Sequence, residues 1–596
     1  MSAPTSRAAA FRQPRCRPAL EWLEDRTLPA GVITGVVYQD FNANGVRDVG
    51  ASLPTVSGSG TAALAVDRGL GGVAVTAADD GGVVRGPATT VADGTYTLTA
   101  AGFGPYRIEF TGLPAGFFPG PSGPDNGSTV RFVPDGNTPD LDLGLVRPAD
   151  FSPNNPDLVT SVYTFGDQLA GPNRDQPVII GFPYTSGAAV GTPGEAPYQQ
   201  PPTHALSVPA NQVGTTWGLA YNPFTQTVYA SAFTKKFAGY GPSGTGAIYQ
   251  TGTAGNTATL FADLNQIFGP GTAGADFRGT PTWVAQGGFF TDGFNTGWDS
   301  VGKTALGGMD ISADGSTLFV VNLADRNLYI LPTSGPLTPA TVRRVPIPNP
   351  ITGATSADPD LDFRPFAVTY HDGRVYVGAV NSAESTQDRN NLSAYVLVYD
   401  PAAGGFAPAP AFQFALNYPR GVGNAFSLDA GGNSASANWL PWTPTYRNLE
   451  GTPRPGFGAD PSTIYPQPWL TGLAFDAAGN LVLGLRDRTG DEVGVQTPDD
   501  PAANTDPTNP SLRRGIAVGD VLRAAFDPAT GTYTLEANGT VGGATSAGAG
   551  NAEGPGGGEF YFQDFTPGPG GAIPIVHADM STGGVLQVPG FPDVAT

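Results

Sequence analysis

The sequence predicts an all-β protein in which a small β-sandwich is followed by a β-propeller. Glycine and proline number 84 and 58 of 596 residues, as expected of many short strands joined by tight turns. Long helical periodicity is absent from the sequence. An apolar strand, a polar turn of the Asn-Pro, Asp-Gly or Ala-Gly-Asn type and a second apolar strand recur four times, which is the pattern of a β-hairpin. The four copies are residues 217–233, 307–323, 364–380 and 471–485.

Residues 1–30 begin with several arginines but lack the apolar centre of a secretory signal. The stretch Leu20–Pro29, LEWLEDRTLP, resembles the LEDR-type N-terminal segment that heads many large exported bacterial proteins. The resemblance implies export, and therefore an extracellular or cell-surface location. The alternative is a disordered basic tail with one short helix.

Residues 31–147 alternate apolar and polar positions between Gly- and Asp-rich turns, which is typical of a small β-sandwich. Strands are expected at 31–38, 71–76, 94–100, 106–110 and 141–146.

The loop at 40–48 carries the clearest chemical signal of the chain. Oxygen-bearing side chains stand at its positions 1, 3, 5 and 9, and Gly45 permits a sharp bend, as hard Ca²⁺ with its oxygen ligands requires. Position 12 is Ala51 rather than Glu and the flanking segment is a strand, so the loop is EF-hand-like on a β scaffold. An Asx-rich turn without metal is the alternative. The expected Ca²⁺ ligands are Asp40, Asn42, Asn44, the Val46 carbonyl and Asp48, with Asp79, Asp80, Asp93 or water completing the shell.

These residues resemble the B domain of serine-aspartate-repeat surface proteins (SdrD B-like). The motifs that carry the resemblance are GVVYQDFNANGVRD, GGVAVT, ADGTYTLT, LPAGF and LDLGLV. The resemblance implies a calcium-stabilised sandwich that acts as a stalk or spacer on the cell surface. Asp40, Asn42, Asn44 and Asp48 match the family's metal-loop motif, whereas the insertion at 49–69 departs from it.

A polar, proline-rich linker at 148–158 leads to a second domain at 159–596. After each hairpin, third and fourth strands are expected, and four antiparallel strands in each repeat indicate propeller blades. Strands at 159–165 and 176–184 and the segment 559–589 would complete six blades. Tandem β-sandwiches are the competing fold. The additional strands are expected at 246–249, 257–261, 327–331, 342–347, 394–399, 411–416, 519–526 and 532–536.

The second domain also resembles the propeller-like part of SdrD B-like bacterial proteins, through stretches such as RPFAVTYHDGRVYVG and GPGGGEFYFQDF. That resemblance carries no catalytic assignment. It leads us to expect the pattern to continue beyond STGGVLQVPG, so that part of a closing blade or an attachment signal would follow.

Composition excludes several classes of function. The formal net charge of −21 argues against a general nucleic-acid binder and against binding to anionic lipid. It suits an extracellular, cation-rich setting, and simple solubility explains it equally well. Cys16 is the single cysteine, so no intrachain disulfide forms. No apolar run reaches the roughly 18 residues of a membrane span.

Other polar residues carry weaker signals. No histidine has a second ligand at metal spacing, so surface or turn positions are expected for His204, His371 and His577. The sequence also shows no nucleophile elbow and no phosphate loop. Structural ion pairs rather than a binding site are expected for the charges on inner strands, Asp310, Arg364 and Arg420. Solvent exposure rather than Ca²⁺ binding is expected for the acidic loop at 487–492, with Asp487, Arg488, Asp491 and Glu492.

Burial rather than stacking on sugars is expected for the tryptophans of the inserts, Trp298, Trp439, Trp442 and Trp469.

Two functions fit these observations. The first is a non-enzymatic secreted or cell-surface protein, with a calcium-stabilised spacer and a propeller for binding or adhesion to an unknown protein or carbohydrate. The second is a propeller enzyme, a glycan or lactone hydrolase or lyase with a divalent metal in the central channel. The sequence favours the first, because it shows no catalytic motif.

Overall fold

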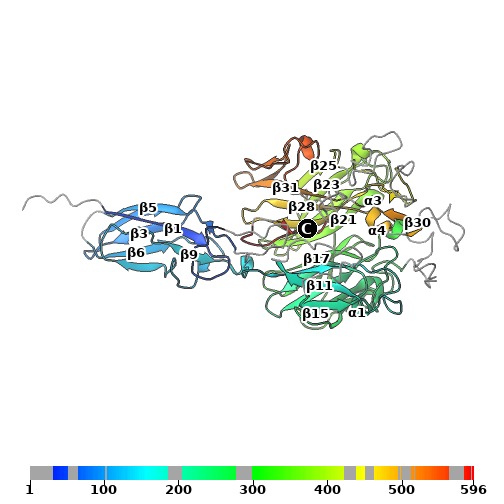
Figure 1. Cartoon of the computed structure of the whole chain (residues 1–596), viewed down its shortest axis with the longest axis horizontal. Coiled ribbons are helices and arrows are strands. Elements are labelled where there is room, and N and C mark those ends of the chain that lie inside the picture. Colours follow the sequence, from blue (N-terminus) through cyan, green and yellow to red (C-terminus); the bar gives the residue numbers. More distant parts are fainter. Residues whose placement is uncertain are drawn as a thin grey trace, which may run out of the picture. The chain divides into compact units, whose positions relative to one another are not determined.

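The computed structural model describes most of the chain from residue 31 onward (Figure 1). The expected export segment at 1–30, with Cys16, and also His577 lie outside the described residues. The chain divides into two compact units, which are residues 1–47 with 67–148 (unit 1) and residues 48–66 with 149–596 (unit 2). The described residues are 31–50, 65–100, 104–184, 204–276, 298–421, 438–449, 462–493, 497–498, 512–515, 517, 519–562, 583–591 and 594–595.

Unit 1 is a sandwich of two β-sheets. One sheet has the order β2-β1-β9-β7 with β5 also paired to β1, and the other has the order β4-β3-β6-β8. The sheets bury alternate side chains: in β5, Tyr96, Leu98 and Ala100 point inward and the threonines between them are exposed. The strands are β1 (Gly31–Gln39), β2 (Arg68–Gly69), β3 (Ala74–Ala78), β4 (Val84–Thr89), β5 (Thr95–Ala100), β6 (Tyr106–Thr111), β7 (Phe118–Pro119), β8 (Val130–Val133) and β9 (Leu143–Val146).

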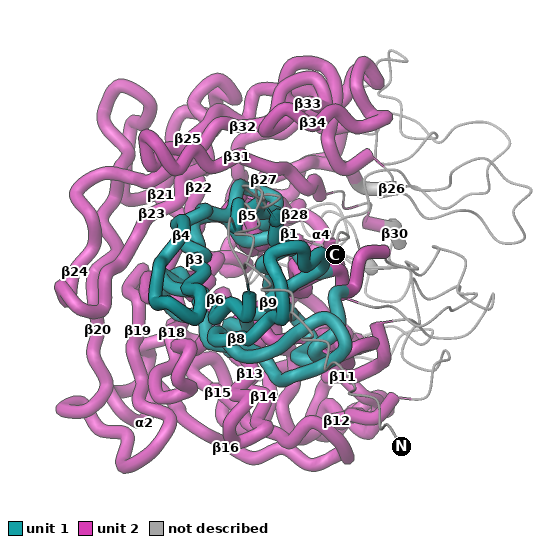
Figure 2. The backbone as a smooth tube through the Cα atoms, turned by 90° about the vertical axis from the view of Figure 1, so that its left-hand side faces the viewer, with its two compact units in different colours: residues 1–47, 67–148 teal, residues 48–66, 149–596 magenta. Residues whose placement is uncertain are grey.

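Unit 2 is a β-propeller. Figure 2 shows its sheets following one another around a ring, from β11 and β12 through β16 and β20 to β25 and β32. Each of the four sequence hairpins supplies the first two strands of one sheet, and the expected third and fourth strands pair next to them. The sheets are β10 (Asp157–Ser161), β11 (Pro177–Pro183) and β12 (Leu206–Pro209); β13 (Thr216–Asn222), β14 (Thr227–Ala232), β15 (Ala247–Gly252) and β16 (Ala258–Asp263); β17 (Leu306–Ile311), β18 (Thr317–Asn322), β19 (Asn327–Pro332) and β20 (Arg343–Pro346); β21 (Phe363–His371), β22 (Arg374–Asn381), β23 (Ser393–Asp400), β24 (Gly405–Phe406) and β25 (Phe412–Ala415); and β27 (Pro468–Phe475), β28 (Leu481–Asp487), β31 (Asp520–Asp527) and β32 (Thr532–Leu535).

The inner strands β13, β17, β21 and β27 contact one another in that order. Aromatic rings from these strands and their loops meet where the inner strands converge. The Phe366 and Trp469 rings lie 4.4 Å apart between centroids, the Trp217 and Phe366 rings 5.9 Å apart, and the Phe233 and Trp469 rings 5.9 Å apart. Edge-to-face packing of this kind fills the interior between the inner strands.

A two-stranded ladder, β35 (Leu586–Gln587) with β36 (Val594–Ala595), joins the last sheet to the first. The Thr471 hydroxyl of β27 donates to the Gly583 carbonyl at 3.0 Å. The Phe591 ring packs on Tyr184, which follows β11, at 4.6 Å between centroids. We call residues 583–591 the closing segment. Among its described residues, the ring of unit 2 thus contains five sheets of at least three strands and this short ladder. Unit 2 also has a small three-stranded sheet of β26 (Ser462–Thr463), β30 (Leu512–Gly515) and β29 (Thr497–Pro498) and a hairpin of β33 (Thr540–Val541) and β34 (Ala544–Thr545), and a count of six blades is not confirmed.

Helices are short and lie in the connections of unit 2: α1 (Ala210–Val213), α2 (Leu264–Phe268), α3 (Pro359–Asp362) and α4 (Thr489–Glu492). Across the described ranges, none approaches the length and hydropathy that crossing a bilayer requires.

Candidate functional site

The expected calcium loop of unit 1 begins where β1 ends, and it winds around the side-chain oxygens of alternate residues. The buried Asp40 carboxylate accepts the backbone N–H groups of Asn44, at 3.1 Å, and Gly45, at 2.8 Å. The Asn42 side-chain oxygen accepts from Asn44 N–H (3.2 Å), and that of Asn44 accepts from Val46 N–H (2.7 Å). These bonds fix the loop in a coiled form with its oxygens at alternate positions, as the ligand pattern requires.

Gly45 is required where it stands. Its φ is +73°, and a Cβ there would lie 2.9 Å from the Gly123 Cα atom and from the Pro121 carbonyl oxygen. The segment that packs so closely also bonds to the loop, because Asp125 N–H donates to the Gly45 carbonyl (3.3 Å) and Arg47 N–H donates to the Asp125 carboxylate (3.1 Å).

Two carboxylates that sequence reasoning missed therefore lie against the loop. Asp125 is one, and Asp67, which accepts Phe41 N–H at 3.2 Å, is the other. Burial raises the pKa of the nearby Tyr38 hydroxyl, and the charges of Asp40, Asp67 and Asp125 raise it further. Negative charge thus accumulates here, which favours a bound cation.

The further ligands expected from sequence are engaged in their own turns. The Asp79 carboxylate accepts Val83 N–H and pairs with Arg85 at 2.8 Å, and that of Asp93 accepts the Thr95 hydroxyl at 2.7 Å; Asp80 is the next residue in the turn of Asp79. In the part of the chain that the structure describes, no three His, Cys, Asp or Glu side chains gather in a metal-holding cluster. A calcium site in this loop would therefore depend on the asparagine amide and backbone oxygens as well, a donor set that fits a hard cation.

The acidic loop of unit 2 corrects an expectation. Asp487, Arg488, Asp491 and Glu492 were expected in solvent, but each is at most 1% exposed. Two of the Asp491 carboxylate contacts go to the Arg486 guanidinium, at 2.5 and 2.6 Å, and a third goes to Lys235 Nζ at 3.0 Å. Burial acts to raise the pKa of Asp491, but Arg486 and Lys235 outweigh it and hold the pKa below its usual range.

The same network continues across several sheets. Arg488 pairs with Glu492 at 2.8 Å, and Gln467 donates to the Glu492 carboxylate at 2.7 Å. Burial raises the pKa of Glu492 to about 8 although both contacts oppose the shift. Glu384 joins Lys303 (2.8 Å) to Arg364 (3.3 Å). We call this set the buried charge network; its ionisable members are Lys235, Lys303, Arg364, Glu384, Arg486, Asp487, Arg488, Asp491 and Glu492, and the half-exposed Asp299 contacts it from the surface.

Tryptophans cover this network. The Arg488 guanidinium lies 4.4 Å from the centroid of Trp442, and that of Arg486 lies 4.6 Å from Trp217. The four tryptophans of the inserts are at most 6% exposed, so their expected burial is confirmed: Trp298, Trp439, Trp442 and Trp469.

Asp310, Arg364 and Arg420 have different partners: Arg364 forms the expected ion pair, with Glu384 at 3.3 Å, whereas Asp310 accepts a backbone N–H and Arg420 packs on an aromatic ring. The Asp310 carboxylate accepts Tyr370 N–H at 2.6 Å and so joins β17 to β21, while burial raises its pKa to about 6. The Arg420 guanidinium lies 4.8 Å from the centroid of Trp439. His371, expected at the surface or in a turn, is the last residue of β21 beside the turn at 372–373, and its ring stacks on Phe475 at 4.0 Å. His204 lies near Phe182, at 6.5 Å between ring centroids.

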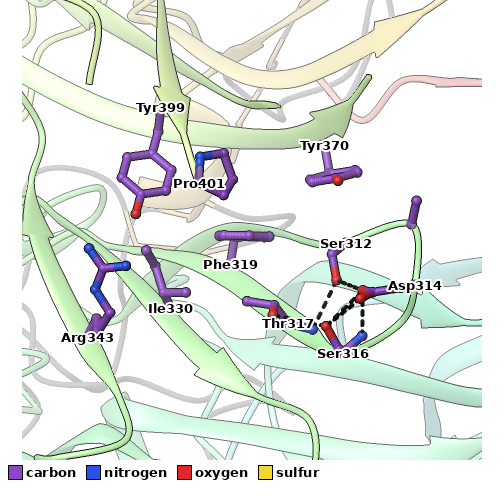
Figure 3. A pocket seen from close by; sticks show the side chains of 11 residues that line it. Ser312, Asp314, Ser316, Thr317, Phe319, Ile330, Arg343, Tyr370, Tyr399 and Pro401 are labelled. Atoms are coloured by element: carbon purple, nitrogen blue, oxygen red, sulfur yellow. Dashed lines mark hydrogen bonds between the residues drawn. The ribbon is translucent and has the colours of Figure 1, made fainter. Parts of the chain in front are cut away.

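A solvent-open cleft of about 490 Å³ lies between the sheet β17–β20 and the sheet β21–β25. Figure 3 shows Tyr370, Tyr399 and Pro401 on one wall and Phe319, Ile330 and the turn Ser312–Thr317 on the other. Arg343 of β20 stands at one end. Sequence reasoning did not find this cleft, because its residues come from five strands and no motif links them.

Comparisons with known proteins give distant similarity. No protein-family model matches the chain. The chain is 28% identical over 98% of its length to colossin-A and 26% identical over 90% to colossin-D, both of Dictyostelium discoideum. It is 30% identical over 20% of its length to serine-aspartate repeat-containing protein D of Staphylococcus aureus (strain Newman). The chain spans 5% and 50% of the two colossins and 8% of the staphylococcal protein. The expected SdrD B-like resemblance is therefore supported over one fifth of the chain.

Among solved structures, the chain is similar to the periplasmic gluconolactonase of Pseudomonas aeruginosa, at 12% identity over 71% of this chain and 88% of that one, with a TM-score of 0.26. It is also similar to a GH43 β-1,3-galactosidase, at 10% identity over 60% of this chain and 85% of that one, with a TM-score of 0.27.

Proposed function

We propose that this chain is a non-enzymatic secreted or cell-surface protein, in which unit 1 is a calcium-stabilised spacer and unit 2 binds a protein or carbohydrate partner. The observation that carries the proposal is the loop Asp40–Arg47, whose side-chain oxygens are fixed at alternate positions beside two further carboxylates, Asp67 and Asp125. The negative charges of Asp40, Asp67 and Asp125 all act on the Tyr38 hydroxyl, so a dication bound beside them would offset this charge and stabilise the folded sandwich.

Binding rather than catalysis is supported by the interior of the propeller. An enzyme with a metal in the central channel needs carboxylates free to ligate it. Aromatic rings instead pack between the inner strands, and the buried carboxylates Asp491 and Glu384 are each shared between two cations. These groups serve the fold, which leaves the outer clefts and loops of unit 2 for recognition.

Calorimetry of the full chain with EGTA or with Ca²⁺ tests the proposal. At a free Ca²⁺ concentration one hundred times its Kd, binding adds about 2.7 kcal/mol to the free energy of unfolding of unit 1. That raises its melting temperature by roughly 10 °C. We expect Asp40→Ala to abolish the rise.

Asp79→Ala is the matched control, because Asp79 also accepts a backbone N–H in a turn of unit 1 but lies in a different loop. The control should keep the full calcium response. A wild-type chain whose melting temperature ignores Ca²⁺ would remove the metal from the proposal.

A further inference from the structure

We propose that the cleft between the sheets β17–β20 and β21–β25 is a binding subsite for one pyranose residue of an uncharged glycan. This inference names a ligand for unit 2 and therefore rests on the proposed binding function. It is argued from the chemistry of the walls, and its test does not depend on calcium.

Aromatic side chains supply the apolar part of the cleft. The Tyr370 and Phe319 rings are inclined by only 15° to each other, with centroids 6.0 Å apart, and Tyr370 is partly exposed while Phe319 is buried. A pyranose has one face of C–H groups, which carry partial positive charge and pack on the electron-rich face of an aromatic ring. Tyr370 is the accessible platform for such packing, and the buried Phe319 belongs to the opposite wall.

Tyr399 supplies a polar group that the protein leaves without a partner. Its side chain is fully buried, and among the described residues its hydroxyl has no hydrogen-bond partner. Figure 3 shows this hydroxyl directed into the cleft. Leaving a buried hydroxyl unbonded costs free energy, and a sugar hydroxyl in the cleft would recover it.

The two charges of the cleft favour a neutral ligand with many hydroxyls. Arg343 is exposed, and within the described ranges it makes one long hydrogen bond, to the Gly404 carbonyl at 3.4 Å, and no ion pair. The Ser312 and Ser316 hydroxyls and Ser316 N–H hold the Asp314 carboxylate and lower its pKa, so it stays ionised. Arg343 at one end of the cleft therefore offers donors, and the Asp314 turn offers a fixed acceptor, as sugar hydroxyls require. The net charge of −21 disfavours acidic glycans.

The size of the cleft agrees with this ligand. Pockets for small molecules measure about 300 to 1,000 Å³, and a cleft of 490 Å³ accommodates a sugar ring with part of its neighbour. Its open side lets a glycan chain enter and leave, so the subsite can take an internal or a terminal residue.

The test is a titration of the full chain with neutral oligosaccharides of glucose, galactose and mannose, and with oligogalacturonate as the charged comparison. We expect at least one neutral series to bind and oligogalacturonate to bind more weakly. Tyr370→Ala should weaken binding about tenfold. Tyr399→Phe, which removes only the hydroxyl, should weaken it about threefold or more.

Arg343→Ala gives a second variant at an exposed position, which keeps the test valid if Tyr370→Ala fails to fold; it should also weaken binding. Tyr221→Ala is the control, because Tyr221 is an exposed aromatic residue of β13 outside the cleft, and it should bind as the wild type does. Sugar binding that none of the cleft variants changes would overturn this subsite while leaving a carbohydrate-binding propeller in place. No binding of any neutral series would overturn the subsite, whereas the calcium response of unit 1 would remain a separate result.

Discussion

Two acidic segments of this chain, Asp40–Arg47 in unit 1 and Asp487–Glu492 in unit 2, have similar compositions and different structures. Both follow the end of a strand and carry several oxygen-bearing side chains within a few residues. The first loop directs its oxygens to its own backbone N–H groups. The second buries its carboxylates against cations, including Lys235 from a distant part of the chain. Local hydrogen bonds and long-range ion pairs thus satisfy the same kind of side chain in two ways.

The difference shows what each loop needs in order to fold. The Asp40 carboxylate accepts N–H groups of its own loop, and the loop is further held by Asp67 and Asp125 from other parts of unit 1. A fully buried carboxylate needs a counter-charge, since an isolated buried charge is expensive. The second loop therefore reaches its structure only when several sheets have come together.

The largest loss of stability is expected from a substitution that removes a buried carboxylate of the second loop. Asp491→Asn keeps the size of the side chain but leaves Lys235 and Arg486 buried without their shared carboxylate. Removing one partner of a buried ion pair costs about 3–5 kcal/mol. Urea denaturation of the full chain should show this loss in the transition of unit 2.

Asp175→Asn is the control, because Asp175 pairs with Arg174 at 3.4 Å on the exposed surface of the same unit. Exposed pairs contribute about 1 kcal/mol or less. Equal losses in the two variants would contradict the structural role of the buried charge network.

A smaller effect is expected in the pH dependence of the free energy of unfolding, through Glu492 of the second loop. The pKa of Glu492 is raised to about 8 in the folded chain from an ordinary value of 4.5. The folded state thus holds a proton that the unfolded state releases, and the free energy of unfolding falls as pH rises from about 4.5 to 8. One such group contributes a slope of at most about 1.4 kcal/mol per pH unit.

Glu492→Gln should make this slope shallower when unfolding is measured between pH 5 and 8.5. Glu536 remains in the variant, and burial together with Asp520 raises its pKa to about 8, so part of the slope persists. Unchanged pH dependence in the variant would show that Glu492 ionises normally in the folded chain.

The smallest effect tests the first loop without metal. Asp125→Ala removes the acceptor of Arg47 N–H, and the free energy of unfolding of unit 1 in EGTA should fall by about 1 kcal/mol. Asp135→Ala is the comparison, since Asp135 accepts Asn137 N–H within its own exposed turn. A loss in Asp125→Ala no larger than in this comparison would mean that the segment around Asp125 does not hold the loop.

Much of the fold follows from local sequence. Each predicted hairpin of unit 2 forms, and the third and fourth strands lie within a few residues of their predicted ranges, because turn residues and apolar alternation act over short distances. In unit 1, β2, β4, β7 and β8 were missed; β4 is largely exposed, and β2 and β7 are each two residues long.

The site was less predictable, because its partners are distant in sequence. Nothing near Asp40 indicates that Asp67 and Asp125 approach its loop, and nothing near Asp491 indicates that Lys235 will pair with it. One signal was available in the composition, since two of the three lysines of the whole chain, Lys235 and Lys303, pair with buried carboxylates. Because lysine is so rare in this chain, we infer a specific structural role at these two positions.

The closing segment has a consequence for biosynthesis. Phe591 packs on Tyr184 and Gly583 accepts from Thr471, so these contacts of the closing segment with the first and last sheets form only after residues 583–591 have left the ribosome. Until then the sheets already made expose edges and apolar faces, to which proteases and neighbouring nascent chains have access. Production of an intact molecule therefore depends on how long that open intermediate survives.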